Sequence, residues 1–435
     1  MRFRIILFLF NSLFLFNLVS AQSTTDSSYI KHLLGLMKDQ DFFLSRDSTN
    51  AIALVRRADC KSQLNDFKGA IIDYKKAIKL KPAVFDKTNN RGYAYHNLAM
   101  AKDSLRDYNG AIEDYTTAFE LYKEDAKMQA LILHNRGQSK GRSKNYQGML
   151  DDNILSVEIL PSYDLGYFGK ASAEWLLERY NEALKDLDKT IELNPNNQGA
   201  LFQRADALVY LKDYASSIKD FTLLLKLYGD NADVYMNRAI SKKELNDQKG
   251  AIEDYNKVIQ MNPDSWLAYY NKGISEYLME DYKGSLFDAE KTTQLNPQNE
   301  WGWLNMGVSK MKLKDFKGAL ADFNKAIEIK PDFSDAYSNR GPAKHELGDD
   351  QGALEDLNKA IQLNPDMAEA YSNRGAVKHH IKDYAGAVQD YTKAISLRPD
   401  HGDSYYNRSL SYEEMGEKKK AKEDAKQAKL LGVTK

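Results

Sequence analysis

Apolar residues in this chain follow a helical pattern that recurs along most of the sequence. Between Ser334 and Met367, apolar residues are spaced by one, three and four positions in two segments, which is the pattern of one apolar helix face. Gly348 suits the end of the first segment, and Asn364-Pro365 ends the second, because proline cannot continue the helical hydrogen bonds. We find no run that alternates with period two. The pattern therefore predicts two short antiparallel helices and no strands.

This two-helix pattern recurs with a period of about 34 residues. Equivalent positions recur at this spacing from Arg179, through Asp213 and Asp247, to Glu417. A fixed period of this length is typical of a solenoid, in which each repeat buries its apolar face only against its neighbours. Eleven repeats are predicted, near residues 51–84, 85–125, 126–163, 164–197, 198–231, 232–265, 266–299, 300–333, 334–367, 368–401 and 402–435.

Two of the spacings are longer than this period. The step from Asp66 to Asp107 has seven extra residues, and the step from Asp107 to Asn145 has four. These numbers are close to two turns and one turn of helix. We therefore expect longer helices in the runs 88–99 and 124–134, with the same buried face.

The residues inside each repeat resemble those of the tetratricopeptide repeat family. In the ninth repeat, the family's aromatic, small and proline positions are occupied by Tyr337, Gly341, Ala353, Ala360 and Pro365. The resemblance extends over about residues 51–435. It implies an all-α, right-handed superhelix of helix-turn-helix repeats, whose first helices line a concave groove. It also implies binding of proteins or peptides rather than catalysis.

By analogy with that family, positions 2, 5, 9, 12 and 13 of each repeat face the groove, and position 6 is usually asparagine. We expect the following groove residues: Phe168, Trp175, Phe202, Tyr210, Tyr270, Tyr277, Trp301, Leu304, Met311, Asn237, Asn271, Asn305, Asn339 and Asn373. The sixth repeat interrupts the apolar residues with Asp233, Lys243 and Glu244, which predicts two apolar patches flanking a charged step. The alternative is that positions 9 and 12 pack between neighbouring repeats instead of facing a ligand.

A pair of oppositely charged residues also recurs with the period. Position 23 is aspartate in all eleven repeats, and position 7 is arginine or lysine in nine of them. Repeats two and eight have Leu98 and Met306 at position 7. Because the pair recurs in the same place, we expect an ion pair between the two helices that sets their register rather than contacts a ligand.

Two local features stand out in repeats nine and ten. Pro342 lies inside a first helix, where it removes the hydrogen bond to Ser338, and we expect it to bend that helix. His345 and His379 are one period apart, so we expect them to be neighbours, with His380 beside them. They have no third strong ligand in the sequence pattern, and we predict a solvated groove wall rather than a metal site.

Composition and motifs argue against other classes of function. Charged residues make up 28% of the chain, with 61 basic and 62 acidic side chains, so no net charge attracts nucleic acid or an anionic membrane. The glycine-containing run 137–143 lacks the Gly-Lys-Ser/Thr ending of a phosphate-binding loop. Cys60 is the only cysteine, and no His-Glu-x-x-His is present. We expect no enzyme activity, no cofactor and no metal.

The N-terminus has the features of a secretory signal peptide. A basic start, an apolar run from Ile5 to Val19 and the small residues before Gln22 predict cleavage after Ala21. An uncleaved membrane anchor is the alternative. Residues 22–50 are then a polar linker with a possible capping helix. The sequence thus predicts an exported scaffold (periplasmic, cell-envelope or extracellular) that binds a protein or extended peptide. A structural or assembly subunit of an envelope complex is the second hypothesis, and the oligomeric state is not predicted.

Overall fold

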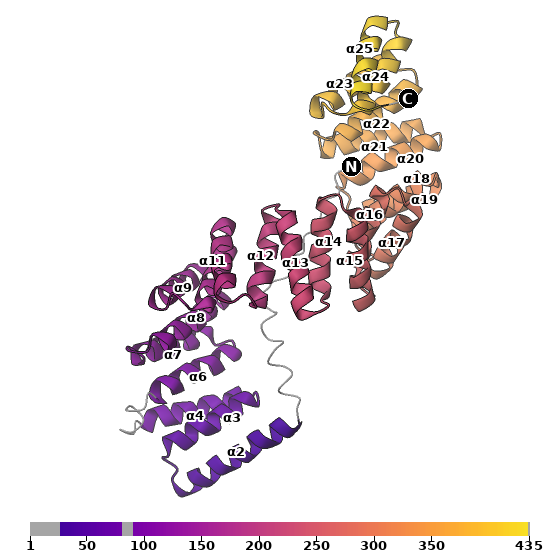
Figure 1. Ribbon diagram of the computed structural model, residues 1–435. Helices are drawn as coiled ribbons and strands as arrows, with labels where there is room; N and C mark the ends of the chain where they lie inside the picture. Colours follow the sequence, from indigo (N-terminus) through magenta and orange to yellow (C-terminus); the bar gives the residue numbers. More distant parts are fainter. Residues whose placement is uncertain (1–26, 81–89, 434–435) are drawn as a thin grey trace. The chain divides into compact units, whose positions relative to one another are not determined.

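The computed structural model describes residues 27–80 and 90–433, and every regular element in these ranges is a helix (Figure 1). The predicted signal peptide lies outside the described residues. None of the helices in the described ranges combines the length and the apolar character needed to span a membrane. The all-α prediction is confirmed.

Eleven antiparallel hairpins follow an N-terminal helix, α2 (Ser27–Arg46). The hairpins are α3 (Ala51–Gln63) with α4 (Phe67–Leu80), α6 (Asn90–Ser104) with α7 (Tyr108–Leu121), α8 (Ala126–Arg142) with α9 (Tyr146–Ile159), α10 (Asp164–Leu176) with α11 (Tyr180–Leu193), α12 (Gln198–Tyr210) with α13 (Tyr214–Tyr228), α14 (Ala232–Glu244) with α15 (Gln248–Met261), α16 (Trp266–Leu278) with α17 (Tyr282–Leu295), α18 (Glu300–Lys312) with α19 (Phe316–Ile329), α20 (Ser334–Glu346) with α21 (Asp350–Leu363), α22 (Ala368–His380) with α23 (Tyr384–Leu397), and α24 (Gly402–Glu414) with α25 (Lys418–Leu430).

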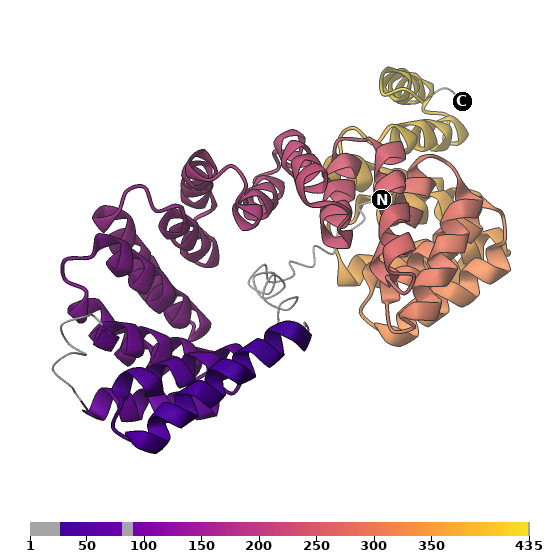
Figure 2. The ribbon, with the colours of Figure 1, turned by 60° about the horizontal axis from the view of Figure 1, so that its bottom comes forward.

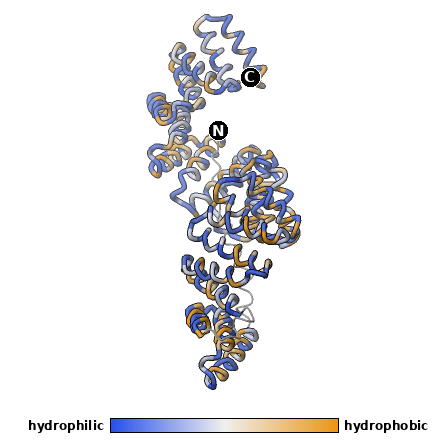
Figure 3. The backbone as a smooth tube through the Cα atoms, turned by 90° about the vertical axis from the view of Figure 1, so that its left-hand side faces the viewer, coloured by the Kyte–Doolittle hydropathy of each residue, from blue (hydrophilic) through white to orange (hydrophobic). Residues whose placement is uncertain are grey.

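The hairpins form two compact units. The N-terminal unit ends at Gly229 and contains α2 to α13, and the C-terminal unit begins at Asp230 and contains α14 to α25. Within each unit, consecutive helices pack side by side, as the two ribbon views show (Figures 1 and 2). Polar and apolar residues are interspersed along the helices, drawn in blue and orange in Figure 3. The terminal α25 buries only Ala421, Asp424 and Ala428, as expected for a cap that faces water.

Each second helix begins one residue after the position that marks the period, such as Asp213, Asp247 or Asp349. At most of these positions an aspartate side chain accepts a hydrogen bond from the main chain of the first turn, as Asp349 does from Gly352 at 2.8 Å. In the residue before the cap, the backbone adopts a left-handed conformation. Gly348 does so as predicted, with φ of 84°, but nine other repeats place a non-glycine residue there, such as Glu280 with φ of 64°.

The extra residues in the early repeats lengthen the helices only partly within the described chain. The helix α8 has 17 residues where most first helices have 13, which accounts for the four extra residues as predicted. The helix α6 has 15 residues and begins at Asn90. The start of the predicted run, 88–89, lies outside the described residues.

Small residues allow the two helices of a hairpin to approach closely. A Cβ atom on Gly307 would lie 2.6 Å from the ring of Phe323, and one on Gly341 would lie 2.7 Å from Leu357. Neither distance is possible without movement, because close-packed interiors leave no free space. The large side chain on the second helix therefore requires glycine on the first, which confirms the role predicted for these positions.

The helix α20 continues through Pro342 and ends four residues later at Glu346. Its length of 13 residues equals that of α18 and α22. Proline at this position therefore does not terminate the helix. The bend predicted from the sequence stays a prediction.

Candidate protein-binding surface

The predicted ion pairs hold the two helices of each hairpin together. In repeat nine, Arg340 donates from Nε and Nη2 to the two carboxylate oxygens of Asp356, at 2.7 and 2.6 Å. All nine predicted pairs are present: Arg57–Asp73, Arg136–Asp152, Lys170–Asp186, Arg204–Asp220, Arg238–Asp254, Lys272–Asp288, Arg340–Asp356, Arg374–Asp390 and Arg408–Asp424. These bonds orient the first helix, whose side chains form the candidate surface.

A second cation in this network was missed from the sequence. Lysine at position 11 binds the same aspartate from one turn further along the helix, as Lys344 binds Asp356 at 2.9 Å. In repeats two and eight this lysine replaces the missing position-7 base: Lys102 binds Asp114 at 2.6 Å and Lys310 binds Asp322 at 2.7 Å. Lys310 and Lys344 are one repeat period apart, and this recurrence could have predicted the second cation from the sequence.

Repeats four and seven have a glutamate at position 11 instead. In repeat four, Glu174 therefore shares Lys170 with Asp186. Burial first, and then the neighbouring Asp186, raise the pKa of Glu174 to about 8, so this carboxyl group is protonated at neutral pH. In repeat seven, burial and Glu276 raise the pKa of Asp288 to about 7. Each of these two sites holds one cation and two carboxyl groups, so the two carboxyl groups share a single positive charge.

The position-7 arginines also join successive repeats. Arg340 donates a third hydrogen bond from Nη1 to Asn324 in the preceding second helix, α19, at 2.7 Å. Arg204 reaches Asp188 of α11 in the same way at 2.8 Å. A side chain buried within one hairpin thus also fixes the distance to the hairpin before it.

Several of the predicted groove residues are buried between first helices instead of exposed. Tyr270 is 2% exposed, Leu304 is 4% exposed, and Phe202 and Trp301 are each 9% exposed. The ring of Trp301 packs on Phe333 with 4.7 Å between centroids. Residues at positions 2 and 5 lie where neighbouring first helices approach each other, so they contribute mainly to packing between repeats.

The predicted residues near the ends of the first helices are more accessible. Phe168, Trp175, Tyr277 and Met311 are half-buried, and Tyr210 is 46% exposed. Except for Phe168, these occupy positions 12 and 13 of their repeats. The accessible part of the predicted groove is therefore its edge near the hairpin turns.

At this edge, three repeat positions converge, and we call each such set an edge triad. It consists of positions 12 and 17 of one repeat and position 13 of the next. In repeats four and five the triad is Trp175, Tyr180 and Tyr210. The ring centroids of Tyr180 and Tyr210 are 4.2 Å apart, and Trp175 lies 4.9 Å from Tyr180 and 5.9 Å from Tyr210.

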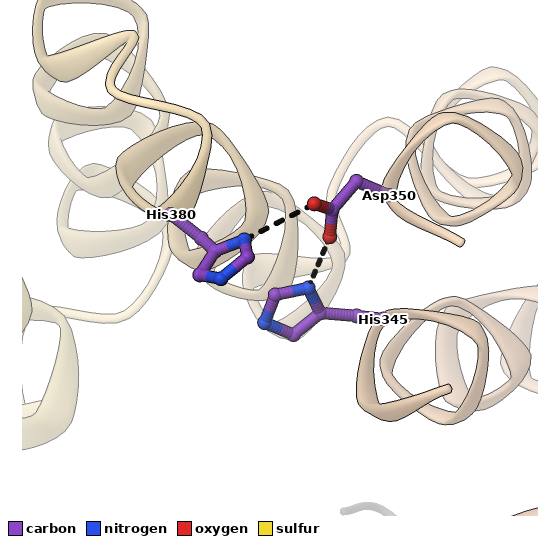
Figure 4. Close-up of side chains that lie close together, drawn as sticks. All are labelled: His345, Asp350 and His380. Atoms are coloured by element: carbon purple, nitrogen blue, oxygen red, sulfur yellow. Dashed lines mark hydrogen bonds and ion pairs between the residues drawn. The ribbon is translucent and has the colours of Figure 1, made fainter. Parts of the chain in front are cut away.

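The same three positions carry different chemistry in the C-terminal unit. In repeats seven and eight, Tyr277 packs on Tyr282, and Lys312 lies over the Tyr282 ring at 5.9 Å. In repeats nine and ten, the positions hold His345, Asp350 and His380 (Figure 4). A binding surface is expected to vary its side chains at a fixed backbone position. Packing alone would favour the same type of residue in every repeat.

Position 17 was not predicted to belong to this surface. The recurring aromatics there, including Tyr180 and Tyr282, look like gap-filling residues when only the hairpin is considered. The predicted contact of His345 with His379 is wrong. His345 contacts His380, with ring centroids 4.8 Å apart, whereas His379 binds Ser411 at 2.9 Å. Neighbouring repeats are offset, so position 12 faces position 13 of the next repeat rather than position 12.

Family models match the chain in both units. The models are described as "Tetratricopeptide repeat" and "TPR repeat", and they match residues 51–84, 92–125, 168–232, 232–265, 301–333, 341–382, 368–401 and 402–431. The chain belongs to the tetratricopeptide repeat family. Members of this family are typically non-enzymatic scaffolds that bind protein or peptide partners. No curated protein matches the sequence significantly.

Solved structures of other tetratricopeptide repeat proteins resemble this chain. A chain of the APC/C hetero-tetramer Cut9-Hcn1 is 13% identical, with 96% of this chain and 94% of that chain covered and a TM-score of 0.50, which supports the solenoid fold. A tetratricopeptide repeat protein from Parabacteroides merdae is 20% identical, with coverage of 57% and 98% and a TM-score of 0.49. YrrB, described as having an unusual peptide-binding site, is 24% identical, with coverage of 42% and 95% and a TM-score of 0.35.

The position-6 asparagines of these tetratricopeptide repeats mostly bind main-chain atoms. Asn339 donates to the carbonyl of Asp335 at 2.8 Å, and Asn271, which is 1% exposed, donates to the carbonyl of Leu267 at 3.0 Å. Asn237 is half-buried. Asn373 reaches the main chain of the preceding repeat. These residues therefore stabilise the first helices in the free protein.

Asn305 differs from the other asparagines. Its Oδ1 is buried and has no hydrogen-bond partner within the described ranges. Asn305 and Tyr277 line a shallow depression between α16 and α18, together with Gly273, Ile274, Ser285, Val308 and Ser309. Because this oxygen is buried beneath the depression, only the ring of Tyr277 is accessible there to a ligand.

Only part of the charged step predicted in repeat six lies on the surface. Asp233 is exposed, but Lys243 is 6% exposed and donates to Asn271 of the next repeat at 3.2 Å. Burial lowers the pKa of Lys243 to about 8. Lys243 therefore links α14 to α16 instead of presenting its ammonium group to solvent.

Proposed function

We propose that this protein is an exported, non-enzymatic scaffold that binds a protein or an extended peptide along the edge formed by its first helices. The observation that carries this proposal is the aromatic edge triad of repeats four and five. Three large rings from two repeats lie together there, and one of them, Tyr210, is 46% exposed.

Such a cluster is suited to anchor an apolar side chain of a partner. Tryptophan and tyrosine combine a large apolar surface with few rotatable bonds, and they are common where binding energy is concentrated. Packing among Trp175, Tyr180 and Tyr210 holds the rings in place before the ligand arrives, which lowers the entropic cost of binding.

The C-terminal unit offers a complementary site. The half-buried Tyr277 lines a shallow depression between α16 and α18, where an apolar side chain of a partner can pack against its ring.

Binding measurements on edge variants test this function. Partners would be captured with the full chain and identified by mass spectrometry, and the affinity of one purified partner would then be measured by calorimetry. Tyr210→Ala and Trp175→Ala are each expected to cost about 1–3 kcal/mol of binding free energy. The matched control is Leu223→Ala, which removes an exposed apolar side chain from the second helix α13 and is expected to bind as the wild type does.

Equal affinity of wild type, Tyr210→Ala and Trp175→Ala would reject the edge as the binding surface. If affinity fell only in Leu223→Ala, the outer helices would be the contact surface instead. That result would favour the structural or assembly subunit, the second hypothesis from the sequence.

The export half of the proposal has its support in the sequence. The basic start, the apolar run and the small residues Val19, Ser20 and Ala21 have the order that signal peptidases require. N-terminal sequencing of the protein recovered outside the cytoplasm is expected to begin at Gln22. Recovery of a chain that still begins at Met1 would show an uncleaved anchor or no export.

A further inference from the structure

Two histidines and one aspartate meet at the edge of repeats nine and ten. His345 lies in the last turn of α20, Asp350 is the first residue of α21, and His380 is the last residue of α22. The Nδ1 atom of His345 is 2.5 Å from one oxygen of Asp350, and the Nδ1 atom of His380 is 3.1 Å from the other. Figure 4 shows the two imidazole rings next to each other, each facing one oxygen of this carboxylate.

The carboxylate of Asp350 is not needed to cap its helix. The neighbouring Asp349 caps α21 by accepting the hydrogen bond of Gly352. In most other repeats of this chain, position 17 is an aromatic residue, as in Tyr180 and Tyr282. The ninth repeat therefore has an acidic group where local structure does not require one, and both groups that face it are imidazoles.

We propose that His345, Asp350 and His380 bind a divalent transition-metal ion of the Zn²⁺ class and thereby link repeats nine and ten. Two imidazole nitrogens and one carboxylate oxygen form a borderline ligand set, which Zn²⁺ accepts and which Ca²⁺ and Mg²⁺ disfavour because they prefer oxygen ligands. Ligand atoms from all three residues lie within 4.8 Å of one another.

Ligand atoms that are up to 4.8 Å apart would have to move by about 1–1.5 Å relative to one another to accept the ion. With bonds of about 2.0–2.1 Å, ligand atoms around a tetrahedral ion are about 3.4 Å apart. The two nitrogen–oxygen separations of 2.5 and 3.1 Å would therefore widen by less than about 1 Å. The side chain of His380 is 64% exposed, which gives it room to turn and leaves the fourth coordination position open to water.

The helix ends also favour a cation at this place. His345 and His380 lie at the C-terminal ends of their helices, where the helix dipole gives a partial negative charge. Two of the ligands belong to one hairpin and the third to the next. Binding therefore stabilises the contact between the two repeats, and above the dissociation constant this stabilisation grows with the logarithm of the metal concentration.

Zinc titration of the full chain, purified without a histidine tag and freed of metal by a chelator, tests the site. Competition with a chromophoric chelator is expected to show one tight equivalent of Zn²⁺, and the thermal unfolding midpoint is expected to rise with Zn²⁺ but not with Ca²⁺ or Mg²⁺. Co²⁺ is expected to give visible absorption bands of a four- or five-coordinate complex. His380→Ala and Asp350→Asn should each weaken binding about tenfold or more.

His379→Ala is the matched control, because His379 lies next to His380 on the same helix but binds Ser411 instead. It should bind Zn²⁺ as the wild type does. His380 is exposed, so His380→Ala should unfold at the wild-type temperature in the absence of metal. The proposal is overturned if the wild type binds no Zn²⁺, or if His380→Ala and Asp350→Asn bind it as tightly as wild type.

Discussion

Asn373 donates a hydrogen bond from its side-chain Nδ2 to the main-chain carbonyl of Ser338, at 3.2 Å. This carbonyl would normally accept the N–H group of residue 342, which is a proline and has none. A side chain from repeat ten therefore satisfies the acceptor that Pro342 leaves open in repeat nine. A hydrogen bond within α20 is thus replaced by a hydrogen bond between repeats nine and ten.

Restoring the N–H group should make the asparagine dispensable. We expect Asn373→Ala to cost about 1 kcal/mol in the wild-type background, because the carbonyl of Ser338 then loses its partner. In a Pro342→Ala background the same change should cost much less. Chemical unfolding of the four proteins of this double-mutant cycle measures the coupling between the two sites. Equal costs in both backgrounds would show that the two residues act independently.

Removing one aspartate of the recurring ion pairs should destabilise its own repeat. Asp254 accepts two hydrogen bonds from Arg238 and binds Lys242 at 2.8 Å. Asp254→Ala leaves two largely buried cations without their partner, and we expect a cost of about 1–3 kcal/mol. Hydrogen exchange should show the loss of protection within residues 232–265, since stability in repeat arrays is local. Glu253→Ala, an exposed neighbour, is the control, and uniform loss of protection across the chain would contradict the prediction.

Repeat four should lose stability as pH rises. In the folded protein Glu174 keeps its proton up to a pKa of about 8, whereas the unfolded chain releases it near 4.5. The proton therefore stabilises the folded state below pH 4.5, and this contribution is lost between pH 4.5 and 8. The free energy of unfolding should fall by less than about 1.4 kcal/mol per pH unit, which is the limit for the release of one proton.

Glu174→Gln should remove this dependence, because glutamine stays neutral at every pH. Urea unfolding between pH 5 and 8 is expected to show a flatter profile than the wild type, with the largest gain in stability at pH 8. The control is Glu192→Gln, whose side chain is 67% exposed and pairs with Lys189 at the surface. A Glu174→Gln profile parallel to that of the wild type would show that Glu174 is ionised throughout.

Glycine should stabilise the turns that lack it. Glu280 has a φ of 64°, a conformation that costs residues with a side chain about 1 kcal/mol or more. We expect Glu280→Gly to raise the thermal unfolding midpoint, since glycine adopts this conformation without strain. Asn246→Gly should gain less, because asparagine tolerates the left-handed region. A fall in the midpoint for Glu280→Gly would mean that the entropy of glycine in the unfolded chain outweighs the relief.

The fold could be predicted from the sequence because each repeat is specified locally. Glycine at position 8 and proline after the second helix act within one hairpin. Because the pattern recurs in eleven copies, it can be recognised as more than a chance arrangement of residues. The ion pairs were predictable for the same reason: Arg340 and Asp356 recur in register at a fixed separation. The lysine at position 11 also recurs. It was not predicted to bind the aspartate, because the base at position 7 already provided a partner for that carboxylate.

The surface was harder to predict because it depends on distances between repeats. Tyr270 and Tyr277 are both aromatic residues on one face of α16, yet Tyr270 is buried and Tyr277 is not. The approach of neighbouring first helices decides this, and no single repeat encodes it. The pairing of His345 with His380 depends on the offset between repeats, which a strict period hides. The signal peptide lies outside the described residues, so it remains a prediction.

The junctions between repeats differ in what holds them together. Between repeats eight and nine, Arg340 reaches back to Asn324, but between repeats seven and eight the equivalent position is Met306, which has no donor. One apolar cluster, which contains Tyr270, Trp301 and Phe333, extends over both junctions. Apolar association weakens on cooling. On cooling, the contact between repeats seven and eight therefore loses more stability than the contact between repeats eight and nine, which the hydrogen bond of Arg340 also stabilises. Two neighbouring contacts in one chain thus differ in their sensitivity to cold.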